Sequence, residues 1–192
     1  MTSYQIIDSP LGEMLLRADD GALTGVYFSG QKYYPAGVPP AALAAGAMPA
    51  ADQRVLAQAA EEIDAYFGGS LRVFAVPIRF RGSAFQQRIW QALRDIDFGE
   101  TSTYGQIGAG LGLPPAHSRA VGGAVGRNPL SVVVPCHRVL GASGALTGYA
   151  GGIDRKRALL RLEGVPDMHG MTTGAARPGA RAATPQRPLA FG

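Results

Sequence analysis

The stretch TYGQIGAGLGLPPAHSRAVGGAVG, residues 103–126, decides the fold of the second half of this chain. Thr103 and Gln106 stand at the spacing of a capping box, so a short helix is predicted to begin there. The two prolines of GLGLPP suit the first turn of a second helix, which ends at Gly126. Two short helices with so brief a connection predict a helix-turn-helix.

The second of these helices contains two adjacent glycines, Gly122 and Gly123. Each costs about 1 kcal/mol relative to alanine inside a helix, so we expect a partner to approach the helix backbone closely. That partner is either the neighbouring helix or a nucleic-acid backbone. In the second case Arg119 projects from the start of the helix toward the nucleic acid.

The flanking segments continue the helical pattern. Residues 83–96 open with the capping pair Ser83 and Gln86 and place four apolar side chains on one face. These are Phe85, Ile89, Trp90 and Leu93. Residues 153–164, IDRKRALLRLEG, predict a closing helix. We therefore assign residues 81–164 to one mainly α domain, helix-turn-helix or winged-helix-like.

Residues 1–80 have a different pattern, which predicts an α/β scaffold domain without a catalytic constellation. Three short segments rich in β-formers are separated by SPLG and DDG turns and read as strands: 3–8, 12–18 and 22–29. Residues 30–50 predict a long loop. Residues 51–69 predict an amphipathic helix, and residues 71–80 a further strand.

Charge is distributed unevenly along the chain. The net charge is −3 over residues 1–80 and +5 over residues 81–164. The basic half indicates either a polyanionic partner or a solvated basic face, and charge alone does not decide between them. Residues 165–192 are rich in Pro, Gly, Ala and Arg without periodicity, so they predict a disordered tail.

Composition narrows the class of protein. With 46% hydrophobic residues the 192-residue chain can bury a core. A single cysteine excludes an internal disulfide and a zinc site built from several cysteines. The sequence begins without the pattern of a signal peptide, and no segment approaches the ~18 apolar residues of a membrane span. We therefore expect a cytoplasmic protein.

The one cysteine lies in VVVPCHRV, residues 132–139. The three β-branched residues predict a buried strand that Pro135 ends, so Cys136 is expected at a strand end. A lone cysteine is usually an inert core residue, but beside His137 the thiol is also a candidate nucleophile. In an extended segment the two side chains point apart, so contact requires a turn or a bridging water.

Five segments, in order, resemble the O6-alkylguanine-DNA alkyltransferase family, the methylated-DNA–protein-cysteine methyltransferases. They are FQQRIWQAL, GETSTYGQIG, SRAVGGAVGRNP, PCHRVLGASGALTGYAGG and RKRALLRLEG. The resemblance covers residues 83–164 and extends more weakly to the N-terminal part. The resemblance implies an RNase H-like N-terminal domain and DNA repair by direct reversal, without cofactor or metal.

The resemblance also implies the chemistry. Cys136 takes the alkyl group from guanine O6, and from O4 of alkylated thymine, in one irreversible turnover. His137 acts as base through a water, and Glu163 orients it. Tyr104 donates a proton to the leaving guanine, and Asn128 fixes the turn that carries the active-site segment.

Further residues are assigned to the substrate pocket and to DNA by the same resemblance. The carbonyls of Cys136 and Val139 accept from the guanine amine, and Tyr149, Ala150 and Gly151 line the pocket. Some family members have serine in place of Ala150, so only a backbone contact survives there. The partner is double-stranded DNA with an alkylated guanine, bound by a monomer. Residues contacting DNA are Tyr104, Arg119, Ala120, Gly122 and Gly123, with the helix in the minor groove, the base flipped out and Arg119 filling the gap.

Two other classes of protein stay open at this point. One is a non-enzymatic helix-turn-helix regulator, against which the cysteine argues. The other is a cysteine hydrolase with Cys136, His137 and Glu163 as a triad. Such a hydrolase would turn over repeatedly and would not need a glycine-containing helix with Arg119.

Overall fold

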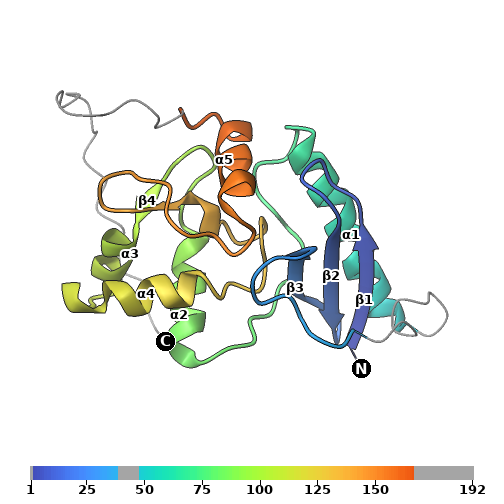
Figure 1. Ribbon diagram of the computed structural model, residues 1–192. Helices are drawn as coiled ribbons and strands as arrows, with labels where there is room; N and C mark the ends of the chain where they lie inside the picture. The colour runs from blue at the N-terminus through green and yellow to red at the C-terminus, as the bar shows by residue number, and fades with distance from the viewer. Residues whose placement is uncertain (1, 39–47, 167–192) are drawn as a thin grey trace.

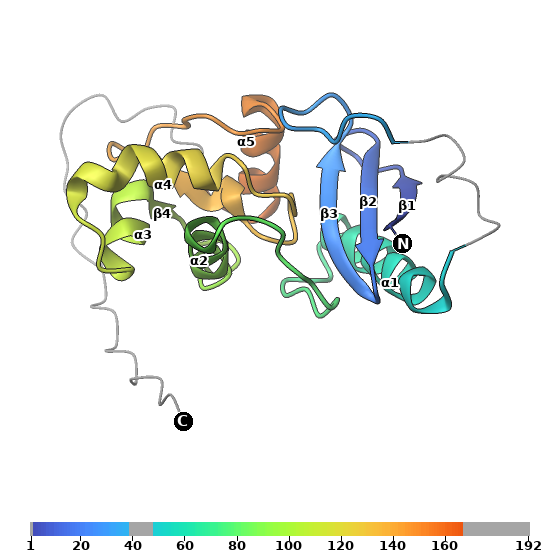
Figure 2. The same ribbon diagram turned by 90° about the horizontal axis from the view of Figure 1, so that it is seen from below.

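Two structural units lie side by side in the computed structural model, which describes residues 2–38 and 48–166 (Figure 1). The first unit is an antiparallel sheet with one long helix packed against it. Its strands β1 (Thr2–Ile7), β2 (Met14–Asp19) and β3 (Ala22–Phe28) are ordered in space as along the chain. Helix α1 (Ala50–Phe67) packs against all three strands (Figure 2).

The predicted strands 3–8, 12–18 and 22–29 and the predicted helix of this unit are confirmed. Asp20 and Gly21, both with positive φ, form the tight turn between β2 and β3 that the DDG sequence predicts. The fully buried Asp52 of α1 accepts hydrogen bonds from the Ser3 hydroxyl at 2.8 Å and from the Gly21 amide at 2.7 Å. These bonds tie the start of the helix to the sheet.

The second unit is mainly helical, as predicted. Its helices are α2 (Ala84–Leu93), α3 (Tyr104–Gly110), α4 (Ser118–Val125) and α5 (Ile153–Leu162). Both predicted capping boxes are present, at Ser83 before α2 and at Thr103 before α3. Two-residue strands β4 (Ser102–Thr103) and β5 (Val139–Leu140) pair in parallel, which the sequence did not predict.

Close packing joins α2, α3 and α4. The buried Trp90 of α2 donates from Nε1 to the carbonyl of Ala124 in α4 at 2.9 Å. A Cβ on Gly108 of α3 would lie 3.6 Å from a methyl of Val121 in α4. The helix predicted to start at the two prolines is a 3₁₀ turn, η2 (Pro115–His117), followed by α4. Gly126 is the C-cap of α4, as predicted.

Two predicted strands are wrong. Residues 71–80 hold only an isolated bridge, between Ile78 and Leu23 of β3, and are otherwise irregular. Residues 132–134 form turns instead of a strand, because Val132 adopts a positive φ of 71°. These valines are buried because the turn packs against the rest of the protein. The β-propensity of a residue does not predict such packing.

The edge of the first sheet holds the chain just ahead of the cysteine. The Val26 amide of β3 donates to the Pro129 carbonyl at 2.8 Å, and the Ser131 amide donates back to the Val26 carbonyl at 3.0 Å. The Ser131 hydroxyl also donates to Gln31 Oε1 at 3.1 Å. The first unit thus positions the segment that leads to Cys136.

The predicted loop at 30–50 is irregular over its described part, and α1 begins at Ala50, inside the range given to the loop. Residues 39–47 and 167–192, and with the latter most of the predicted tail, lie outside the described residues. Over the two described ranges, none of the helices has the length and apolar character needed to cross a membrane.

Candidate active site

The cysteine lies at the first position of a buried 3₁₀ turn, η3 (Cys136–Arg138). Tight turns precede it: the Val133 amide donates to Ser131, and the Cys136 amide donates to Val134, at 2.9 and 2.8 Å. The Cys136 side chain is only 6% exposed. The predicted strand end is therefore replaced by a turn, and within it Cys136 contacts Asn128 while His137 contacts Glu163.

Asn128 is the residue that holds this turn. Its Nδ2 donates to the Val134 carbonyl at 2.8 Å and to the Sγ of Cys136 at 3.1 Å, and its Oδ1 accepts from the Leu130 amide at 3.0 Å. One buried amide thus bonds to the backbone on both sides of the turn and to the sulfur itself. The predicted role of Asn128 in this turn fits these contacts.

His137 and Glu163 form a buried pair. His137 Nε2 and Glu163 Oε1 are 2.8 Å apart, and both side chains are fully enclosed. Among the described residues, no hydrogen-bond partner exists for the other ring nitrogen, Nδ1. The structure records no direct hydrogen bond between His137 and the Cys136 sulfur, so a bridging group is needed to connect them.

Glu163 has further donors that the sequence did not indicate. Arg138 donates to its carboxylate from Nε at 2.8 Å and from Nη2 at 2.9 Å, and the Tyr66 hydroxyl donates to Oε1 at 2.7 Å. Burial by itself would raise the pKa of the Glu163 carboxyl, but the hydrogen bonds from His137 and Arg138 outweigh it and lower the pKa to about 2. Glu163 is therefore a carboxylate at any working pH.

The cysteine and the histidine are both neutral at rest. Burial raises the pKa of the Cys136 thiol, and the hydrogen bond from Asn128 and the charge of Lys156 offset this only in part. Burial lowers the pKa of His137, against the raising effect of Glu163. The resting pair is thus a thiol beside an imidazole that is free to accept its proton.

Lys156 of α5 is a fully buried cation beside this cluster. Its ammonium donates to the carbonyls of Val139 and Thr147, the latter at 2.8 Å. Burial lowers the pKa of Lys156 to about 8, against the raising effect of Cys136. The Val139 carbonyl, predicted to accept from guanine, therefore already accepts one hydrogen bond.

An open hollow of about 630 Å³ lies between α4, the start of α3 and the segment 147–150. Five of the predicted residues line it: Tyr104, Gly122, Gly123, Tyr149 and Ala150, together with Lys32 and Tyr33 of the first unit. A Cβ on Gly122 would lie 3.7 Å from the Tyr104 ring, so this part of α4 faces the hollow as well as its neighbour. Tyr149 lines the hollow, and burial followed by the proximity of Cys136 raises its pKa, so it connects the hollow to the cysteine.

The other predicted residues, Cys136 among them, do not line this hollow. Arg119 and Ala120 are exposed near the start of α4. Gly151 packs beneath the Tyr149 ring, where a Cβ would approach the ring to 2.6 Å, so any larger residue would displace Tyr149. The hydroxyl of Thr147 donates to the Tyr104 hydroxyl at 3.3 Å, which orients that phenol at the wall of the hollow.

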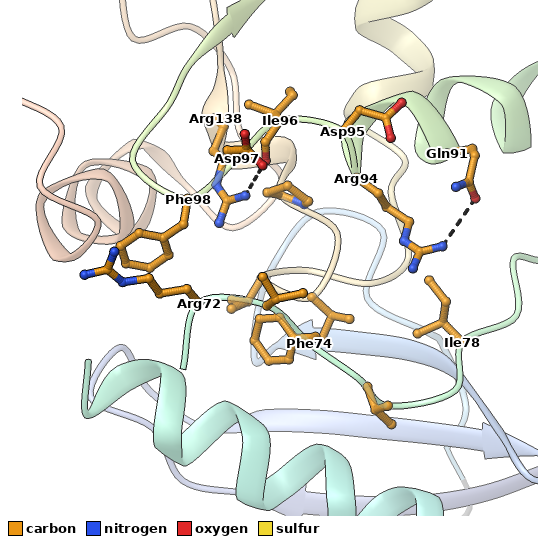
Figure 3. A pocket seen from close by; sticks show the side chains of 15 residues that line it. Arg72, Phe74, Ile78, Gln91, Arg94, Asp95, Ile96, Asp97, Phe98 and Arg138 are labelled. Atoms are coloured by element: carbon orange, nitrogen blue, oxygen red, sulfur yellow. Dashed lines mark hydrogen bonds between the residues drawn. The ribbon is translucent and has the colours of Figure 1, made fainter. Parts of the chain in front are cut away.

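A second hollow, of about 250 Å³, borders the cysteine turn at Pro135 and Arg138 (Figure 3). It is lined by the irregular segment Arg72–Ile78, by the end of α2 and by Pro135 and Arg138. Figure 3 shows Arg138 donating to the Ile96 carbonyl, with Phe98 near its guanidinium. None of the residues predicted for substrate or DNA lies in this hollow.

Sequence reasoning missed Arg138, Lys156, Tyr66 and the Lys32–Tyr33 pair. Arg138 follows the candidate base His137 directly, and a charge so close to a candidate nucleophile is a signal that could have been used. Lys156 falls on the buried side of α5 by helical period. Tyr66 is 97 residues away from Glu163, and nothing local in the sequence connects the two.

Comparison with known proteins agrees with this architecture. Residues 2–80 match the model of the 6-O-methylguanine DNA methyltransferase ribonuclease-like domain, and residues 84–165 match that of the family's DNA-binding domain. A methylated-DNA–protein-cysteine methyltransferase of Mycolicibacterium paratuberculosis is 45% identical over 85% of this chain and 93% of its own. One of Haemophilus influenzae is 42% identical over 85% of this chain and 87% of its own.

A solved structure is similar as well. The crystal structure of Mycobacterium tuberculosis OGT in complex with DNA superposes with a TM-score of 0.71 at 43% identity, covering 84% of this chain and 92% of that one. Both domain models of the family match in the family's order, and the relatives are similar over most of their length. These two findings together assign the chain to a family. The chain belongs to the 6-O-methylguanine DNA methyltransferase family and is a methylated-DNA–protein-cysteine methyltransferase.

Proposed function

We propose that this protein repairs DNA by one irreversible transfer of an alkyl group to Cys136, from O6-alkylguanine and also from O4-alkylthymine in double-stranded DNA. The observation that carries the proposal is the buried cluster of Asn128, Cys136, His137 and Glu163 beside an open hollow. A buried thiol beside a neutral base, which an ionised acid orients, can act as a nucleophile once the base accepts the thiol proton.

In the reaction, Cys136 Sγ attacks the alkyl carbon, the new bond is carbon–sulfur, and the bond to guanine O6 breaks. The thiol proton passes to His137 Nδ1, the ring nitrogen without a partner among the described residues, through a bridging water. Nε2 faces the Glu163 carboxylate, which stabilises the imidazolium as it forms. The guanine leaves with its bonding electrons and must gain a proton.

Tyr104 is the proposed source of that proton. Its hydroxyl lies at the wall of the hollow and accepts from Thr147, so its own hydrogen is free to point toward a bound base. The proposed carbonyl contacts to the guanine amine come from Cys136 and Val139, and the proposed amide contact near O6 from Ala150. Tyr149 and Gly151 shape the wall behind them.

Entry of the base requires that it leave the stack, because the target atom is inaccessible in a duplex. Helices α3 and α4 are proposed to dock as a helix-turn-helix, in a winged-helix-like arrangement, with α4 in the minor groove. The exposed Arg119 and Ala120 face solvent at the start of α4, where the duplex would lie, and Arg119 would fill the gap. Gly122 and Gly123 let the DNA backbone approach the hollow.

Alkylation of Cys136 to a thioether is irreversible in this protein. Reversal requires a second nucleophile, and the chain contains no other cysteine. We therefore expect one alkyl group per chain and no turnover. The division at residues 80 and 164, a monomeric state and a cytoplasmic location stay predictions.

The decisive experiment is incubation with double-stranded DNA that carries a labelled O6-methylguanine, followed by mass spectrometry of the protein. The expected result is one methyl group on the peptide that contains Cys136 and a repaired guanine in the DNA. A protein that binds DNA without gaining mass would be a regulator, and one that cleaves acyl substrates repeatedly would be a hydrolase. Either result, or sustained turnover, would contradict the proposal.

A further inference from the structure

Tyr66 connects the first unit to the chemistry of the second. It lies in the last turn of α1, its side chain is fully buried, and its hydroxyl donates to Glu163 Oε1 at 2.7 Å. The same oxygen lies 2.8 Å from His137 Nε2. Arg138 Nη2 donates to this oxygen as well, at 2.9 Å. One carboxylate oxygen therefore joins the tyrosine of the first unit to the histidine and the arginine of the second.

The ring of Tyr66 is held from both units, which fixes where its hydroxyl points. Phe74 of the first unit lies 5.5 Å away between ring centroids, and Phe98 of the second unit lies 6.2 Å away, edge to face. Phe74 and Phe98 are both visible in Figure 3, on the hollow that borders the cysteine turn. A buried hydroxyl in so rigid a setting cannot turn to another acceptor without breaking this packing.

We propose that Tyr66 is a positioning residue of the alkyl-transfer site, which holds Glu163 in place and limits how strongly the carboxylate attracts the His137 proton. A hydroxyl that donates to a carboxylate oxygen disperses its negative charge. Less charge on Oε1 stabilises the imidazolium of His137 less, so the histidine stays neutral over a wider range of pH. The inference rests on the proposed relay of Cys136, His137 and Glu163.

Within the described residues, other charged and titratable side chains also face this cluster. Arg138 faces Glu163 from η3 with two hydrogen bonds. Lys156 faces His137 and Cys136 from α5, and Tyr149 is the remaining titratable neighbour of Tyr66. Burial, followed by the charge of Glu163, raises the pKa of Tyr66, so the phenol stays protonated and remains a donor at every pH at which the protein is folded.

The test is Tyr66→Phe, with Tyr27→Phe as the matched control. Tyr27 is also a buried tyrosine of the first unit, on β3, and it makes no recorded hydrogen bond to the site. The measurement is the pH dependence of dealkylation of free O6-benzylguanine, together with the NMR titration of the His137 ring. The free base removes DNA binding from the comparison.

In Tyr66→Phe the His137 pKa and the acid limb of the rate profile are expected to rise by roughly 0.5–1 pH unit. This is less than the ~1–2 units of a direct hydrogen bond to a charged group, because Tyr66 acts on His137 only through Glu163. On that limb the variant would react about 3–10-fold more slowly than wild type at equal pH. Tyr27→Phe would follow the wild-type profile. If the Tyr66→Phe profile and the His137 titration both superimpose on wild type, the inference is overturned.

A second variant keeps the inference testable if Tyr66→Phe does not fold. A fluorinated tyrosine placed at position 66 keeps the ring and donates more strongly, so the acid limb should move to lower pH. A shift in the other direction, or none, would contradict the inference. Failure of the wild-type protein itself to accept an alkyl group would instead refute the proposed function, so the two outcomes are distinguishable.

Discussion

Replacing Glu163 by glutamine tests the buried cluster through protein stability. The carboxyl pKa is lowered from 4.5 to about 2 in the folded protein. Each pKa unit corresponds to about 1.4 kcal/mol, so the ionised Glu163 stabilises the fold by roughly 3 kcal/mol at neutral pH. Breaking a buried ion pair by removing one partner is expected to cost about 3–5 kcal/mol, which agrees in size.

The sign of the pH dependence follows from the lowered pKa. A carboxyl with a depressed folded-state pKa contributes its full stabilisation above the unfolded pKa and loses it as pH falls toward the folded pKa. Here the window runs from pH 4.5 down to about 2. More than half of the roughly 3 kcal/mol should already be lost at pH 3.

The assay is thermal or urea unfolding of wild type and Glu163→Gln at pH 7 and pH 3. At pH 7 the variant should melt roughly 6–12 °C below wild type, at ~2–4 °C per kcal/mol for a chain of this size. Glu61→Gln removes the same charge from an exposed position of α1 and should leave the midpoint nearly unchanged. If the gap between wild type and Glu163→Gln is as wide at pH 3 as at pH 7, the ionised cluster is not what stabilises this region.

Three further predictions concern the reaction itself. Cys136→Ser should abolish alkyl transfer while DNA binding stays measurable in a mobility-shift assay; residual transfer would place the acceptor elsewhere. Arg119→Ala should slow repair of duplex DNA by about 10–100-fold more than dealkylation of free O6-benzylguanine, because unstacking costs a few kcal/mol and the free base incurs none of it; equal losses would assign Arg119 to the fold. Lys156→Met should slow transfer at pH 7, because the thiolate loses a nearby cation. That deficit should narrow above pH 8, where wild-type Lys156 itself loses its charge; a constant deficit would point to the lost hydrogen bonds instead.

The sequence by itself determined the features that depend on near neighbours in the chain. The capping boxes at Ser83 and Thr103 join residues three apart, so a four-residue pattern is enough to predict them. Short segments rich in β-formers, separated by the SPLG and DDG turns, predicted the three strands for the same reason. The ordered motifs around Cys136 indicated the family, because residue identity at fixed spacing is itself local information.

Only the tertiary structure decided how the cysteine is presented and what surrounds it. The valines at 132–134 have strand propensity, but packing forces Val132 to a positive φ, since the segment must turn beneath Asn128. Their propensity for strand is worth less than the burial and hydrogen bonds that the turn provides.

Of the partners of Glu163, one was predictable from the sequence and another depends on the tertiary structure. His137 was predicted from its place beside Cys136, whereas Tyr66 reaches the carboxylate from the other unit of the protein. A hydrogen bond between residues 97 positions apart has no periodic or compositional signature, because it depends on how two separately patterned units pack together. The sequence therefore determined which groups can react, and the packing of the two units decided the charges and donors that tune them.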